Sequence, residues 1–128
     1  MTDVRFAAYE QVGTLTADPP ALVLMLYDGA VRFLRRAERA LAQGDTVAFA
    51  QAQNRAHAIV AELRGALDPR VGAEVGTNLA RLYDFMLVHL SEGLVAKSPA
   101  HVQHVLGLLE TLRDAFRDAV EQTRRGPA

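Results

Sequence analysis

The chain has 128 residues, of which 50% are apolar, and this length and composition favour one folded domain with a single hydrophobic core over a disordered chain. The absence of cysteine excludes disulfides and thiolate metal sites. With 14 basic and 15 acidic residues the formal net charge is -1, so no strong field attracts polyanions, and nucleic acid is disfavoured as the main partner.

Residues 1 to 17 form a leader that precedes the first predicted helix. This leader carries four dispersed apolar residues, Phe6, Tyr9, Val12 and Leu15. It is therefore too apolar to be a plain solvated tail, and it is too short to form a stable helix alone. We expect it to pack on the domain formed by residues 18 to 125.

Four segments follow the leader, separated by proline, glycine and aspartate breakers, and each has apolar residues at helical spacing. The first segment is expected to begin with Asp18 as its N-cap and Pro19 as its first helical residue. Its predicted core stripe consists of Leu22, Leu26, Ala30, Phe33, Ala37 and Leu41.

The other three segments repeat the helical pattern. The second begins at Asp45 and is expected to be helical to about Leu67, with an apolar side formed by Phe49, Ala52, Ala56, Ile59, Leu63 and Leu67. The third ends near the breaker Gly93 and has an apolar side formed by Val75, Leu79, Leu82, Met86 and Leu90. The fourth is capped by Ser98 and Pro99, and its apolar side is Val102, Val105, Leu109, Leu112 and Phe116.

These segments predict an all-α fold, because none of them alternates with the period of two that is typical of a strand. Amphipathic helices joined by short connections pack antiparallel around a shared core. The sequence therefore predicts an antiparallel up-and-down four-helix bundle with a short N-terminal leader packed on it.

The run from Ala21 to Tyr27 departs from this pattern, because it is apolar around nearly two full turns. A bundle helix needs only one apolar stripe, so one side of this run has no core to enter. Two explanations stay open: the leader covers the second side, or a partner binds there. The run is far shorter than the roughly 20 residues that span a bilayer, so we expect a cytoplasmic protein without membrane insertion.

Tyr27, Asp28 and Gly29 follow directly. Glycine inside a helix costs about 1 kcal/mol relative to alanine, which indicates that another backbone approaches Gly29 closely. If the ring of Tyr27 is buried, its hydroxyl needs a hydrogen-bond partner. We expect a carboxylate on an adjacent helix or on the leader.

The four histidines give no catalytic pattern. His101 and His104 lie three residues apart on a predicted helix, but no third ligand stands at matching spacing, so neither a metal site nor a cofactor is predicted. His57 and His89 have no nucleophile and carboxylate in a recognisable arrangement. We therefore expect a protein that is not an enzyme.

The string Leu24-Met25-Leu26-Tyr27-Asp28-Gly29-Ala30 resembles the signature of the flagellar secretion chaperone family FliS. Further similarities follow in family order from about residue 9 to residue 116: Tyr9 with residues 16–19, Ile59–Leu63 with Leu67-Asp68, Asn78-Leu79 with Leu82–Met86, and Leu108-Leu109 with Leu112–Phe116. The chain departs from the family pattern at Thr14, at the capping box before the first helix, and around Gly93.

The resemblance implies a chaperone that binds the C-terminal, disordered region of monomeric flagellin and prevents its premature polymerisation in the cytoplasm. Other flagellar regulators or export components are further candidate partners. On this interpretation the flagellin-binding residues are Tyr9, Leu22, Met25, Tyr27, Asp28, Gly29, Ile59 and Tyr83.

Two alternatives belong to other classes. A phosphotransfer bundle of a signalling relay has a similar length and helix count, although it typically needs Lys-Gly three residues after an exposed histidine, which none of the four histidines has. A generic dimerising bundle would use the surplus apolar side of the first helix only as a self-interface.

Overall fold

The computed structural model describes residues 19–68 and 74–124, so the leader and its docking lie outside the described residues. The described residues form four helices: α2 (Pro20–Ala42), α3 (Thr46–Ala66), α4 (Glu74–Ala96) and α5 (Pro99–Arg124). Within these two ranges no β-strand is formed. The predicted all-α class is confirmed.

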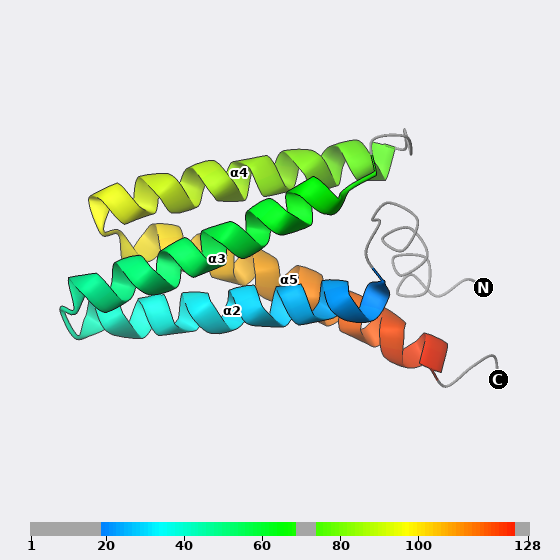
Figure 1. Cartoon of the computed structure of the whole chain (residues 1–128), viewed down its shortest axis with the longest axis horizontal. Coiled ribbons are helices and arrows are strands. Elements are labelled where there is room, and N and C mark those ends of the chain that lie inside the picture. Colours follow the sequence, from blue (N-terminus) through cyan, green and yellow to red (C-terminus); the bar gives the residue numbers. More distant parts are fainter. Residues whose placement is uncertain (1–18, 69–73, 125–128) are drawn as a thin grey trace.

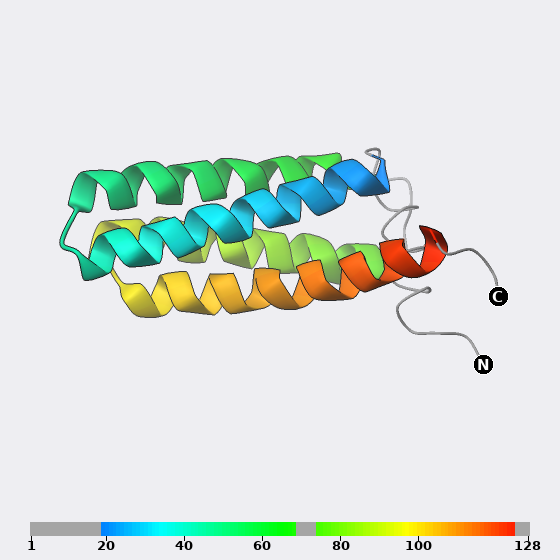
Figure 2. The same ribbon diagram turned by 90° about the horizontal axis from the view of Figure 1, so that it is seen from below.

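The four helices run in alternating directions along one bundle axis (Figures 1 and 2). α2 packs against α3 and α5, and α4 also packs against α3 and α5. The helices therefore form a ring in chain order, in which α2 and α4 lie on opposite sides of the core. This arrangement is the predicted up-and-down bundle.

Local capping explains where α3 and α5 begin. The Asp45 carboxylate accepts the backbone N–H of Ala48 at 3.0 Å and caps α3. Ser98 Oγ accepts the backbone N–H of His101 at 3.3 Å in the first turn of α5. Both caps confirm the sequence prediction.

The start of α2 differs from the prediction. Pro19 is the N-cap, with ψ of 146°, and the helix begins at Pro20 rather than at Pro19. A proline disfavours the α conformation at the residue before it, so Pro20 favours an extended Pro19. Asp18, the predicted cap, lies outside the described residues.

The third helix does not end at Gly93, although the sequence predicts its end near this residue. α4 continues to Ala96, and Lys97 then adopts the left-handed conformation, with φ of 50°. Gly93 is buried, and a Cβ added to it would lie 2.7 Å from Cβ of His101. This glycine allows α5 to approach α4 closely instead of terminating the helix.

The core matches the predicted stripes in α5 and most of α3, but in α2 it includes only Ala30 and Ala37 of the predicted stripe. In α5, Leu112 is half-buried and the other four predicted residues are buried. In α3, Ile59 and the C-cap residue Leu67 are half-buried and the other four predicted residues are buried. In α2 the buried residues are Val23, Tyr27, Gly29, Ala30, Val31, Leu34, Ala37 and Ala40. Of the other residues of the predicted stripe, Leu22 is exposed, and Leu26, Phe33 and Leu41 are half-buried and pack against the core.

The burial pattern gives a prediction for two leucines. Leu109 is fully buried on α5, so Leu109→Ala should lower the free energy of unfolding by about 2–5 kcal/mol. Leu22 is 38% exposed on α2, and Leu22→Ala should cost less than about 1 kcal/mol. Urea denaturation followed by circular dichroism measures both values. Equal losses for the two variants would contradict the described core.

Candidate functional site

The first two turns of α2 place apolar side chains on both sides of the helix. Val23 and Tyr27 are 2% and 1% exposed and belong to the core. Leu22 and Met25 are 38% and 68% exposed. The expectation that this run has more apolar surface than the bundle core accepts is therefore confirmed.

Tyr27 and Tyr83 meet in the middle of the bundle. Their hydroxyl groups are hydrogen-bonded to each other, which joins α2 to α4 across the core. The ring of Phe116 on α5 contacts Tyr27 edge-on, with 6.1 Å between ring centroids. Burial raises the pKa of both phenols above its usual range, so both hydroxyls stay protonated.

The partner of Tyr27 differs from the prediction. The predicted partner is a carboxylate on an adjacent helix or on the leader, whereas the observed partner is a second phenol on α4. A neutral partner satisfies the buried hydroxyl without burying a charge, which is the less costly solution in an apolar core. Tyr27 and Tyr83 are therefore core residues that orient α2, and neither side chain reaches the surface.

Gly29 accommodates a side chain rather than a backbone. A Cβ added to Gly29 would lie 3.3 Å from Cδ1 of Ile59, which reaches over from α3. The expected close approach of another backbone is thus replaced by the tip of a half-buried isoleucine. Gly29 lets Ile59 fill the seam between the two helices.

Asp28 is exposed and points toward α5. Its Oδ1 lies 3.9 Å from Nε of Arg113, which also forms a shorter ion pair of 2.9 Å with Asp114. Because the Asp28 side chain is 51% exposed, its pair with Arg113 adds little to stability. The carboxylate remains accessible to a partner.

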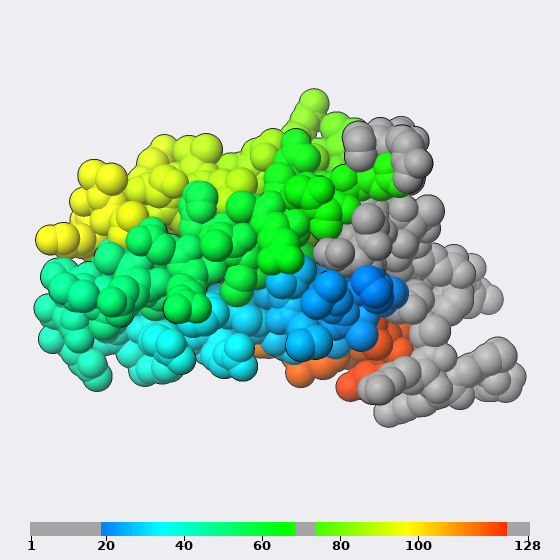
Figure 3. Space-filling model, viewed as in Figure 1, coloured from blue at the N-terminus to red at the C-terminus, as the bar shows by residue number. Residues whose placement is uncertain are grey.

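An open groove of about 770 Å³ lies farther along the same seam, between α2 and α3. Both helices are on the face shown in Figure 3. The guanidinium carbons of Arg36 and Arg55 lie 5.3 and 5.9 Å from the ring centroid of Phe33. The other lining residues are Ala48, Gln51, Ala52, Asn54 and Ala58. The groove is not apparent from the sequence, because the spacing of Phe33 predicts a core position.

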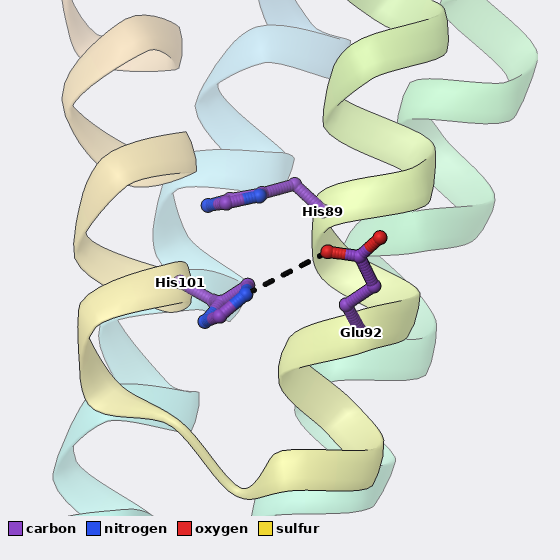
Figure 4. A group of neighbouring side chains, drawn as sticks. All are labelled: His89, Glu92 and His101. Carbon is purple, nitrogen blue, oxygen red and sulfur yellow. Dashed lines mark ion pairs between the residues drawn. The ribbon is translucent and has the colours of Figure 1, made fainter.

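One group of side chains among the described residues has the composition of a metal site: His89, Glu92 and His101 (Figure 4). The sequence prediction of no metal site considered spacing along one helix, whereas this group joins α4 and α5. Partial desolvation, and then the nearby His101 and His104, lower the pKa of His89. A neutral imidazole is the form that binds metals.

The predicted site residues thus separate into three groups. Leu22, Met25 and Asp28 are exposed at the start of α2, and Ile59 is half-buried beside them on α3. Tyr27, Gly29 and Tyr83 are buried and hold this region together. Tyr9 lies outside the described residues.

Comparisons with known proteins identify the family. The sequence profile of the family described as "Flagellar protein FliS" matches residues 2–123. The chain belongs to the FliS family. It is 36% identical to the flagellar secretion chaperone FliS of Salmonella typhimurium over 115 residues, which cover 86% of this chain and 85% of the relative. It is 28% identical to the Bacillus subtilis chaperone of the same name over 120 residues, or 94% and 89% of the two chains.

A solved structure agrees at the level of the fold. A bacterial flagellar chaperone crystal structure superposes with a TM-score of 0.73 at 20% sequence identity, over 84% of this chain and 87% of that chain. FliS is a family of flagellar secretion chaperones, so the chain is not an enzyme. Family membership thereby excludes the phosphotransfer alternative.

Among the described residues, no helix combines the length and the apolar character needed to cross a bilayer.

The tyrosine pair of this FliS protein gives a prediction with an internal control. Tyr27→Phe or Tyr83→Phe alone leaves one buried hydroxyl without its partner and should lower the free energy of unfolding by about 1–3 kcal/mol. The double variant removes both hydroxyls and should cost no more than the more damaging single change. Urea denaturation of the four proteins measures this coupling. Strictly additive losses would show that the two hydroxyls do not depend on each other.

Proposed function

We propose that the protein is a cytoplasmic chaperone that binds the C-terminal disordered region of monomeric flagellin and prevents its premature polymerisation. The proposal rests chiefly on the apolar edge of α2, which is formed by Leu22, Met25, Leu26 and Phe33. The opposite side of this helix is packed in the core, so this edge can contact a partner. Membership of a flagellar secretion chaperone family supports a flagellar protein as the partner.

The edge of α2 has the geometry of a helix-binding seam. Leu22, Leu26 and Phe33 stand four and seven residues apart, so they align along one side of the helix. Ile59 reaches over Gly29 between them and continues the apolar surface onto α3. An amphipathic segment can lay its apolar side along such a seam.

Charge gives the seam a direction. Its far end is the groove in which Arg36 and Arg55 lie against Phe33, whereas its near end is the uncharged Leu22. A bound segment with acidic residues toward one end would be favoured in one orientation. A disordered partner pays an entropy cost on ordering, which a long seam can offset through a large buried area.

The predicted binding residues take different roles in this proposal. Leu22, Met25 and Asp28 contact flagellin, and Ile59 lines the seam from α3. The buried residues Tyr27, Gly29 and Tyr83 keep α2 in the orientation that exposes this edge. For the leader, including Tyr9, we propose a movable cover of the apolar edge that flagellin displaces.

Calorimetry with full-length and C-terminally truncated flagellin tests the proposal. The full-length protein should bind one to one, and truncation should remove binding. Met25→Glu places a charge on the apolar edge and should weaken binding at least about tenfold, equivalent to about 1.4 kcal/mol.

Val95→Glu is the matched control, because Val95 is 86% exposed on α4, away from the seam, and should leave the affinity unchanged. Equal affinity for intact and truncated flagellin would overturn the choice of segment. Equal weakening by both substitutions would overturn the choice of surface.

A further inference from the structure

The turn between α4 and α5 brings three metal-binding side chains together at the end of the bundle opposite the start of α2 (Figure 1). His89 and Glu92 come from the last turns of α4, and His101 comes from the first turn of α5. Their ligand atoms all lie within 4.8 Å of one another. Figure 4 shows the three side chains in the space between the two helices.

The backbone fixes this approach. Only Lys97 and Ser98 separate the two helices, so the first turn of α5 must fold back onto the last turns of α4. Gly93 removes the one Cβ that would collide there, since such an atom would lie 2.7 Å from Cβ of His101. The proximity of the three ligands therefore follows from the packing of buried backbone.

The two imidazole rings contact each other and neighbouring side chains. Nδ1 of His101 lies 2.8 Å from Ser98 Oγ, and when Nδ1–H donates to this hydroxyl, the lone pair of Nε2 is free. That Nε2 is 3.8 Å from Oε2 of Glu92. The ring of His89 stacks on His101 with 4.2 Å between centroids, and on Phe85 with 4.9 Å. A hydrogen-bonded, oriented histidine is typical of metal sites.

We propose that His89, Glu92 and His101 bind a divalent transition metal ion of the Zn²⁺ class. Two imidazoles and one carboxylate suit zinc, nickel or copper and are a common three-residue zinc set, with water in the fourth position. Metal–ligand distances of about 2.0–2.2 Å put ligand atoms roughly 3.4 Å apart in a tetrahedron. To reach that spacing the side chains must rotate, and the two imidazoles must leave their stacked arrangement so that both nitrogen lone pairs point at one ion.

The site goes beyond the proposed binding of flagellin and does not depend on it. The metal ion would link α4 to α5 beside the turn that joins these two helices, far from the exposed edge of α2. An ion that binds the folded chain only stabilises it by mass action. The expected property is thus a metal-dependent stability of the bundle.

Titration of the untagged protein with ZnCl2 and with CoCl2 tests the site. Zinc should bind one to one and, at about 100 times its Kd, raise the melting temperature by about 5–10 °C. Cobalt should give visible absorption bands that saturate at one equivalent. Glu92→Gln and His101→Ala should each weaken binding at least about tenfold. Because Glu92 is exposed, Glu92→Gln keeps the test valid if His101→Ala destabilises the fold.

Glu62→Gln and His57→Ala are the matched controls on α3, away from the turn between α4 and α5, and should bind zinc like the unaltered protein. Absence of saturable binding would overturn the proposal. So would an affinity that Glu92→Gln leaves intact, or a loss that the control variants share.

Discussion

The hydrogen bond between the hydroxyls of Tyr27 and Tyr83 constrains the rotation of α2 about its axis, and the exposed surface follows from that rotation. An α-helix turns by about 100° per residue, so a Tyr27 that points into the core places Met25 about 160° away. Leu22 lies about 140° away by the same geometry. The observed exposure of both residues is therefore a consequence of how the core closes across α2 and α4.

This dependence explains which parts of the fold were predictable. The capping residues Asp45 and Ser98 and the periodic apolar residues of α5 are local signals, and they correctly predicted helix starts and core positions. The rotation of α2 was not predictable in this way, because residues 21–27 are apolar all round and periodicity cannot select a side. A partner at residue 83, on a different helix, makes that selection.

The same distinction applies to the candidate sites. The surplus of apolar surface at the start of α2 was visible in the sequence, as was the contribution of Gly29 to packing. The contact between Gly29 and Ile59 and the groove around Phe33 depend on how α2 and α3 pack. The group of His89, Glu92 and His101 arises because Gly93, which looks like a helix breaker, instead permits close packing of α4 and α5.

The central claim is that flagellin covers the outer edge of α2 while the core stays closed, and the methionine methyl groups report on both. Met25 is 68% exposed on that edge, and Met86 is fully buried in the core. NMR spectra of the methyl-labelled protein should show a large shift or broadening of Met25, and little change at Met86, when the C-terminal flagellin segment is added. A segment that binds by calorimetry yet leaves Met25 unperturbed, or perturbs Met86 more strongly, would contradict the account.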